Sequence, residues 1–339
     1  MRGEVATLKF ELTDGTVYLD DVFFQSISTK LGNPTFARSS ENTHRENYLI
    51  EKPQYTLSYN DATKGPNWVS WQLNKSWLGN TTRPSETVPP GYPPTGFPEG
   101  TYPADKLDYP WLGDSDLPST WVRTEGPDYR LNERGMEKGH MTASADRNRT
   151  TKDIYSTFLT SNMLPQHGSG NNRGAWQTFE RNIRTSLENS SVARDYYIVA
   201  GGYGYDPNNA IGNRVSVGPD GRTELDRNGT WTVNPKGILI PDFTWKIVVP
   251  LVAGQSLDNI TANAEVVAIM VPNRRELVTP TDFPLPGETN RQITNWNSWQ
   301  DWRVSIDYLE DLTGYNFLSN LPETIQDKIE ERDNGLLPS

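Results

Sequence analysis

The sequence contains no cysteine in its 339 residues, and this absence removes several classes of site at once. Disulfide scaffolds, cysteine-ligated zinc, iron–sulfur clusters and thiol nucleophiles all need that residue. Histidine is almost as scarce, because only His44, His140 and His167 are present. Neither the HExxH pattern of zinc proteases nor a histidine-rich metal cluster can be built from them. Any metal ion must therefore be held by oxygen or imidazole.

Long apolar segments are also missing. Hydrophobic residues make up only 34% of the chain, and no run approaches the roughly 18 apolar residues that a membrane span needs. The first eight residues lack a basic region followed by an apolar stretch, so no signal peptide is visible. These absences exclude a transmembrane protein. Aromatic residues are plentiful, with 11 Trp, 15 Tyr and 10 Phe.

Positive charge is in the minority, with 32 Lys and Arg against 43 Asp and Glu, a net charge of −11. An acidic total argues at first against a nucleic-acid partner, because neutralising phosphates needs local positive charge. The distribution is uneven, however. Residues 130–184 hold nine basic and five acidic residues, whereas residues 305–339 hold two basic and eight acidic ones. A chance fluctuation between solvated faces is one interpretation; otherwise the contrast indicates where an anionic substrate binds.

The chain is long enough for one large domain preceded by a short extra segment. Residues 1–26 alternate as strands do, and residues 17–22 resemble the closing strand of extracellular carbohydrate-binding jelly rolls, which predicts the tail of an upstream module. Residues 81–119 are rich in proline and glycine and predict a long surface loop between tryptophan-rich segments. Further along, the pattern predicts strands at 195–200, 244–252 and 266–271 and a helix at 322–333.

Three short segments concentrate polar residues suited to catalysis: residues 137–147, 160–166 and 171–184. The last of them has helical character, and every fourth residue from Asn172 to Arg184 falls on one broad helix face. The two intervening members of that series are Trp176 and Glu180. An amide, a carboxylate and a guanidinium are therefore predicted to lie beside one another.

His140 is the central candidate, although a lone histidine is more often structural than catalytic. It follows Gly139, which lets another part of the backbone approach closely, and it is preceded by the charged pair Glu137 and Lys138. Metal-assisted phosphodiester hydrolysis needs such a combination. It uses a general base that titrates near neutral pH, a hard cation held by few protein oxygens and several waters, and cations that offset phosphate charge.

Together these segments resemble the DNA/RNA non-specific endonucleases, the family of mitochondrial endonuclease G and of secreted bacterial nucleases with a ββα-metal site. The resemblance rests on residues 137–140, which stand where the family has Asp-Arg-Gly-His, on the Asn-x-x-Pro-Gln motif from Asn162, and on the Asn-x-Gly-x-Trp-x-x-x-Glu motif from Asn172. It extends from about Lys30 to residues 312–315 and is closest to the secreted cyanobacterial type.

The resemblance implies a fold and a domain. The fold is α+β, with a mixed, mainly antiparallel sheet flanked by helices and a strand–strand–helix metal site. The nuclease domain is expected to cover residues 27–335, followed by a tail at 336–339.

The resemblance also implies roles for individual residues. His140 is expected to be the general base, and Asn172 the single direct protein ligand of a hydrated Mg²⁺ or Mn²⁺. Glu180 is expected to hold waters of that ion. Four residues are expected to serve the substrate or support the site: Arg83, Lys138, Asn162 and Arg184.

Two departures from the family pattern bear on these roles. Glu137-Lys138 stands where Asp-Arg is usual, and Ala143 stands where many members have proline. Lysine keeps the positive charge but lacks the two-pronged geometry of arginine, so its phosphate contact should be looser. The longer side chain of Glu137 reaches further than aspartate does, which leaves its partner open.

The expected activity is hydrolysis of DNA and RNA to 5′-phosphate ends by a secreted enzyme that has no membrane partner. Two alternatives remain. One is a non-enzymatic extracellular carbohydrate-binding module, favoured by the aromatic content and residues 17–22. The other is a metal phosphodiesterase acting on small molecules. The sequence identifies neither a protein inhibitor nor an oligomeric state.

Overall fold

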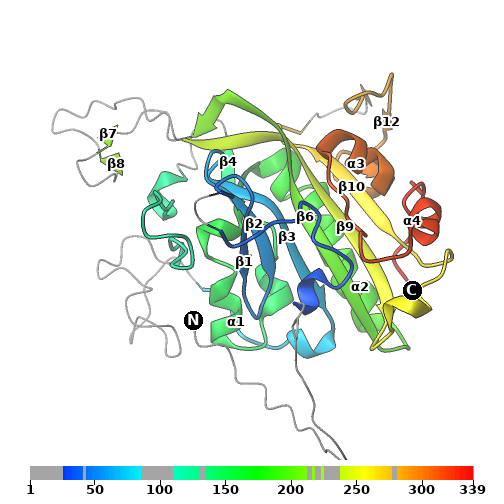
Figure 1. Cartoon of the computed structure of the whole chain (residues 1–339). Coiled ribbons are helices and arrows are strands. Elements are labelled where there is room, and N and C mark those ends of the chain that lie inside the picture. Colours follow the sequence, from blue (N-terminus) through cyan, green and yellow to red (C-terminus); the bar gives the residue numbers. More distant parts are fainter. Residues whose placement is uncertain are drawn as a thin grey trace, which may run out of the picture.

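The structure is a computed structural model of the chain (Figure 1). It describes residues 26–40, 43–84, 110–129, 135–211, 216–217, 223–224, 237–276 and 281–338. The strands predicted before residue 26 lie outside this range, as do residues 85–109 of the predicted proline-rich loop. No helix in the described part of the chain is long and apolar enough to cross a membrane.

A seven-stranded sheet forms the centre of the molecule. In spatial order its strands are β1 (Tyr48–Glu51), β2 (Thr56–Asn60), β3 (Gly65–Leu73), β6 (Arg194–Ile211), β9 (Ile238–Val252), β10 (Val267–Pro272) and β13 (Arg303–Val304). Every pairing in it is antiparallel. The predicted α+β class with a mainly antiparallel sheet is confirmed, and the only parallel pairings among the described residues are two isolated bridges. The strands predicted at 195–200, 244–252 and 266–271 correspond to parts of β6, β9 and β10, but β6 continues to Ile211 and β9 already begins at Ile238.

Smaller elements surround this sheet. Three two-stranded sheets are formed by β4 (Met136–His140) with β5 (Met163–His167), β7 (Ser216–Val217) with β8 (Thr223–Glu224), and β11 (Thr281–Asp282) with β12 (Gln292–Ile293). The α-helices are α1 (Thr151–Ser156), α2 (Ala175–Asn189), α3 (Ile306–Thr313) and α4 (Glu323–Ile329). Single-turn 3-10 helices occupy Ile27–Thr29, Lys75–Trp77, Gly126–Asp128, Ser144–Arg147, Thr160–Asn162, Leu257–Asn259 and Trp299–Trp302.

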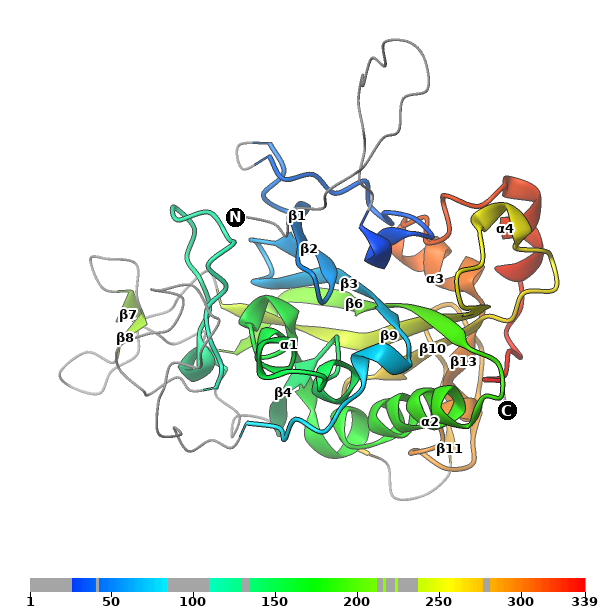
Figure 2. The same ribbon diagram turned by 90° about the horizontal axis from the view of Figure 1, so that it is seen from below.

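The helices cover opposite faces of the central sheet. In Figure 2, α1, α2 and β4 lie on one side and α3 and α4 on the other. Neighbouring residues of β9 show the same division, because side chains alternate across a strand. Trp245 packs against Phe317, with 4.9 Å between ring centroids, whereas the Nζ atom of Lys246 lies 4.0 Å from the ring centroid of Trp176 in α2.

Amphipathic spacing explains how α2 packs on its face of the sheet. Phe179, Ile183 and Leu187 are all buried and recur every fourth residue, as a helix with one apolar face requires. α3 begins at the N-cap Ser305, whose hydroxyl accepts from the Tyr308 N–H, and ends at Gly314 in the left-handed conformation.

Two predicted helices differ from those observed. α2 begins at Ala175, so Asn172 lies in the π-helical turn before it, not on the helix face. The helix predicted at 322–333 ends at Ile329. It stops there because the carbonyl oxygen of Glu330 accepts the N–H groups of Ile306 and Asp307, which are the first residues of α3.

Candidate active site

The strands β4 and β5 and the helix α2 form a strand–strand–helix unit that carries most of the predicted residues. β4 pairs with β5 in antiparallel register, with His140 opposite Met163 and Glu137 opposite Gln166. Gly139 is required in this pairing because a Cβ atom there would lie 1.8 Å from the Oε1 atom of Gln166. The glycine therefore lets the glutamine side chain cross the strand immediately before His140.

His140 is the last residue of β4 and lies in an aromatic pocket. Its ring centroid is 5.3 Å from that of Trp111 and 4.9 Å from that of Phe158. Only 9% of the residue is exposed, and its Nε2 atom is buried without a hydrogen-bond partner among the described residues. An unpaired buried nitrogen carries an energetic penalty of about 1–3 kcal/mol. Such an atom is suited to accept a proton from a reactant that enters the site.

The charge state of His140 follows from its surroundings. Burial lowers the pKa of the imidazole well below 6.5, and the positive charges of Arg83 and Lys246 lower it further. All three effects disfavour the imidazolium ion. The ring is therefore neutral at neutral pH, as a general base must be.

Two cations predicted to serve the substrate lie beside the same aromatic rings. Lys138 and His140 both contact Trp111, because residues two apart on a strand share a face, and the lysine Nζ lies 5.0 Å from that ring centroid. Arg83 is exposed, and its Cζ lies 5.4 Å from the ring centroid of Phe158. The structure thus brings Arg83, Lys138 and His140 around one aromatic pocket.

Glu137 points to the other face of β4 and contacts the predicted metal ligand. Its Oε2 accepts from the Nδ2 of Asn172 at 2.8 Å, and its Oε1 pairs with Arg173 at 2.7 Å. A carboxylate oxygen can only accept at this contact, so the amide nitrogen of Asn172, and not its oxygen, faces Glu137. The Oδ1 atom of Asn172 is left without a partner among the described residues. The longer glutamate therefore orients the amide oxygen that a cation would use.

Glu180 is held by a lysine that was not singled out in the sequence. Its Oε1 lies 2.7 Å from the Nζ of Lys246, which is fully buried between the rings of Trp176 and Trp71. Burial lowers the pKa of Lys246, while the carboxylate opposes that shift. The second oxygen of Glu180 has no partner among the described residues and is available to a hydrated ion.

Arg184 contacts Asp146 rather than its helix neighbour Glu180. Its Nη1 lies 2.7 Å from the Oδ1 of Asp146, whose Oδ2 accepts from the Nε1 of Trp71. This pair raises the pKa of Arg184 despite partial burial. The arrangement joins α2 to the segment that follows His140.

Asn162 is fully buried against the segment that follows β4. Its Oδ1 accepts from the N–H of Thr142, and its Nδ2 donates to the carbonyl oxygens of Thr142 and Thr157. Both polar atoms are therefore engaged by the backbone. Such an asparagine holds the chain after His140 in place, which favours a positioning role over direct contact with a substrate.

Further residues that the sequence did not single out fix the strand–strand–helix unit to the central sheet. The Nδ2 of Asn171 donates to Thr244 and to carbonyl oxygens at the end of β10, and its Oδ1 accepts from Gln166. Asn273 donates to the carbonyls of Pro165 and Pro241 and accepts from the N–H of His167. These buried amides hold β5 and the turn that carries Asn172 in a fixed position against the central sheet.

The donor set fits a hard divalent cation. Asn172 and Glu180 offer one amide oxygen and one carboxylate oxygen, and the chain has no cysteine that would favour a softer metal. So few protein ligands are typical of Mg²⁺, which keeps several of its waters. A neutral histidine and two exposed or half-buried cations add the other groups that metal-assisted phosphodiester hydrolysis requires.

Known proteins resemble this chain along most of its length. Residues 32–324 match the family described as DNA/RNA non-specific endonuclease. The Nuclease of the cyanobacterium Nostoc sp. is 36% identical over 309 residues, which cover 91% of this chain and 86% of that protein. The Mitochondrial nuclease of Saccharomyces cerevisiae is 29% identical over 81% of this chain and 66% of its own length.

A solved structure has a similar fold. The crystal structure of the EndoG/EndoGI complex superposes with a TM-score of 0.53 at 19% identity and covers 87% of this chain and 91% of that one. This likeness supports the ββα-metal fold that the sequence predicts.

Proposed function

Because the chain belongs to the DNA/RNA non-specific endonuclease family, we propose that it is a metal-dependent endonuclease that hydrolyses phosphodiester bonds of DNA and RNA and leaves 5′-phosphate ends. The observation that carries the mechanism is the buried Nε2 of His140, which has no hydrogen-bond partner in the described part of the chain and belongs to a ring held neutral by its surroundings. Secretion stays a prediction from the resemblance.

In the proposed reaction, His140 accepts a proton at Nε2 from the water whose oxygen attacks phosphorus. The bond from phosphorus to the 3′ oxygen breaks, and the 3′ oxygen leaves with a proton taken from solvent. Arg83 and Lys138 bind the phosphate and offset its charge. Both cations lie beside the rings that hold His140, so the phosphate would be drawn to the base. These contacts fall on the phosphate backbone, which carries no sequence information, so base specificity is expected to be slight.

Asn172 and Glu180 would hold a Mg²⁺ or Mn²⁺ ion, Asn172 directly and Glu180 through water. Such an ion, when bound, neutralises charge that develops on the phosphate and on the leaving oxygen. Glu137 accepts from the amide nitrogen of Asn172 and so leaves the amide oxygen for the ion, and Lys246 fixes one oxygen of Glu180. We assign both to positioning roles. Arg184 and Asn162 support the site through Asp146 and through the backbone after His140.

Substrate breadth tests the proposed function. Single- and double-stranded DNA and RNA should be cut at comparable rates, and affinity should fall with salt because basic residues contact phosphates. Arg83→Ala should reduce the slope of log affinity against log salt by about one. Lys328→Ala is the matched control, because that exposed lysine lies on α4 at the opposite face of the sheet and should leave the slope unchanged.

A preference for one sugar by several orders of magnitude would contradict this proposal. Hydrolysis of a small phosphodiester without cleavage of polymeric DNA would favour the small-molecule phosphodiesterase instead. Sugar binding that is indifferent to changes at His140 would favour the carbohydrate-binding alternative, whose signal at residues 17–22 lies outside the described part of the chain.

The pH dependence of cleavage tests the state of His140. Its pKa is lowered in the folded protein, so the neutral, proton-accepting ring persists as the pH falls to 6.5 and is lost only below that value. The acidic limb of kcat/KM should therefore lie below pH 6.5, the ordinary value for histidine. The profile should be recorded at saturating Mg²⁺, with His44→Gln as a control that leaves the limb in place. An acidic limb at or above pH 6.5 is incompatible with this assignment.

A further inference from the structure

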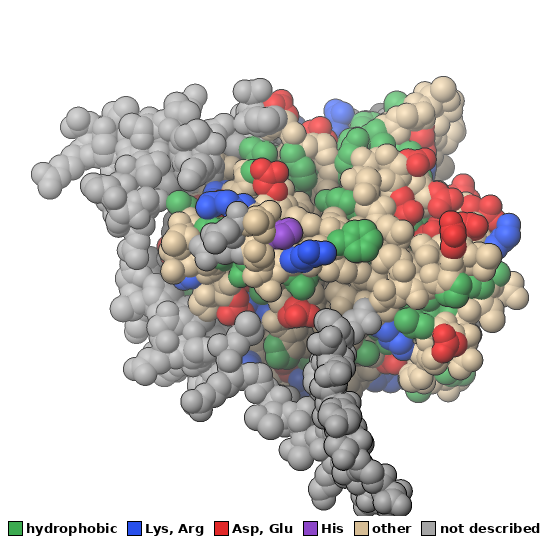
Figure 3. Space-filling view, in the orientation of Figure 1, with side chains coloured by type: hydrophobic (Ala, Val, Ile, Leu, Met, Phe, Trp, Pro, Cys, Tyr) green, Lys and Arg blue, Asp and Glu red, His purple; other side chains and the backbone are tan. Residues whose placement is uncertain are grey.

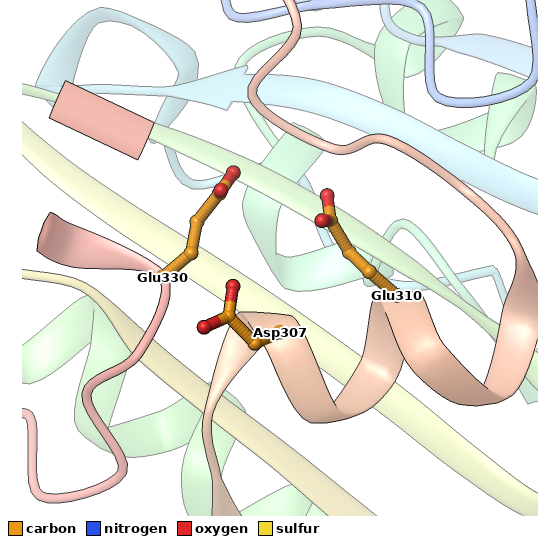
Figure 4. Close-up of side chains that lie close together, drawn as sticks. All are labelled: Asp307, Glu310 and Glu330. Carbon is orange, nitrogen blue, oxygen red and sulfur yellow. The ribbon is translucent and has the colours of Figure 1, made fainter. Parts of the chain in front are cut away.

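A group of acidic side chains lies on the face of the central sheet opposite to that of His140. Figure 3 shows acidic side chains gathered over α3 and α4. Both helices belong to residues 305–339, which contain eight acidic and only two basic residues. Within this segment, carboxylate oxygens of Asp307, Glu310 and Glu330 lie within 4.8 Å of one another. Figure 4 shows the three side chains converging between the start of α3 and the end of α4.

These three carboxylates have almost no compensating partners. None of them forms an ion pair among the described residues, and the only hydrogen-bond donor that reaches any of them is the N–H of Phe317, at 2.7 Å from Glu310. Like charges at this spacing repel one another unless a proton or a cation lies between them. The three carboxylates therefore need a proton or a cation between them in order to lie this close together.

Glu330 provides a separate observation. Only 4% of the residue is exposed, and its Oε1 atom is buried without a hydrogen-bond partner among the described residues. A buried carboxylate oxygen is costly unless it is paired or coordinates a metal.

The backbone fixes this geometry in advance. The carbonyl of Glu330 accepts the N–H groups of Ile306 and Asp307 at 2.9 and 3.1 Å. The last turn of α4 is thereby joined to the first turn of α3, and two of the carboxylates are placed by main-chain bonds. Asp307 and Glu310 are half-buried, so solvent and ions have access to the group.

We propose that Asp307, Glu310 and Glu330 form a second divalent-cation site that binds Ca²⁺ and joins α4 to α3. Three carboxylates with oxygen ligands only suit Ca²⁺, which accepts six to eight oxygens in flexible geometry. Mg²⁺ is less suited, because it demands a nearly ideal octahedron and gives up its waters reluctantly. The site is separate from Asn172 and Glu180 and serves stability, so it does not depend on the proposed nuclease mechanism.

Thermal unfolding of the chelator-treated chain tests this site. Ca²⁺ at about one hundred times its Kd should raise the Tm of the wild type by roughly 5 °C. Glu330→Gln and Glu310→Gln should lose that increase. Glu323→Gln removes the same charge from an exposed position of α4 and should keep it. Isothermal titration calorimetry with CaCl₂ should count one fewer bound ion in Glu330→Gln than in Glu323→Gln.

Cleavage of DNA in Mg²⁺ separates this proposal from the active site, because Glu330→Gln should cut at the rate of the wild type. Equal Ca²⁺ responses and equal ion counts in the wild type and all three variants would overturn the second site and would mean that the carboxyl groups share protons instead. If Glu330→Gln is folded by circular dichroism and still binds the additional ion, the assignment is also wrong.

Discussion

Replacing His140 with alanine is expected to lower the rate of cleavage by about 10²–10⁴-fold, the usual contribution of general-base catalysis. The reason is local. Nε2 of His140 is buried and has no partner among the residues that the structure describes, and burial keeps the ring neutral. Neither His44 nor His167 occupies the pocket formed by Trp111 and Phe158. No other imidazole can replace it. Affinity for nucleic acid should change little, because the phosphate contacts assigned to Arg83 and Lys138 remain.

The measurement is paired, with cleavage rate and DNA affinity determined on the same purified variant and circular dichroism confirming the fold. His44→Ala is the matched control, since it removes an imidazole that has no place in the site. A folded His140→Ala protein that cuts within about tenfold of the wild type would mean that the ring is structural.

Replacing Asn172 with alanine should nearly abolish cleavage. Loss of a residue that merely supports a metal ligand typically lowers affinity or activity by about 10–100-fold, so loss of the single direct ligand should exceed about 100-fold. The fold should survive, because Asn172 is only half-buried and Glu137 keeps its pairing with Arg173. Asn171 differs, since its fully buried amide fixes the turn to the sheet.

Activity of Asn172→Ala should be compared with Mn²⁺ binding followed by electron paramagnetic resonance. The variant should lose both. Asn263→Ala, which changes an exposed asparagine far along the chain, should lose neither. Retention of Mn²⁺ binding together with wild-type cleavage would remove Asn172 from the metal site.

The sequence predicted the strands and motifs that form the site better than it predicted the contacts between the side chains of the site. Mainly apolar stretches predicted parts of β6, β9 and β10, and the motifs predicted which residues the strand–strand–helix unit carries. Asn172 was wrongly placed on the helix face, because a π-helical turn precedes α2. Local periodicity gives no warning of such a turn, which is fixed by Asn171 and Asn273 through contacts distant in sequence.

The position of Lys246 in the sequence indicated a buried charge but did not indicate its partner. A lysine within the apolar strand at 244–252 is unusual, because a buried charge needs a partner. The partner is Glu180, 66 residues earlier, and only the folded chain identifies it. The sequence likewise did not predict that Glu137 contacts Asn172. That contact depends on where the turn after β5 lies relative to β4, which the sequence alone does not give.

The helix at the C-terminal end shows the same limit. Proline and glycine at its ends predicted residues 322–333, but α4 stops at Ile329. The carbonyl of Glu330 turns there to accept two N–H groups of α3, and this tertiary contact replaces further helical hydrogen bonds. The acidic excess of this segment was visible in the sequence, whereas the convergence of Asp307, Glu310 and Glu330 was not.

We propose that this chain cuts nucleic acid in the middle of a strand and needs a divalent metal ion to do so. Closed-circular plasmid DNA is the most direct substrate, because it has no ends and a single cut changes its mobility. The chelator-treated protein should leave the plasmid supercoiled in excess EDTA, and addition of Mg²⁺ in excess of the chelator should produce nicked and then linear molecules. Equal cleavage in excess EDTA, or an intact plasmid after Mg²⁺ or Mn²⁺ is restored, would contradict the proposed metal-dependent endonuclease.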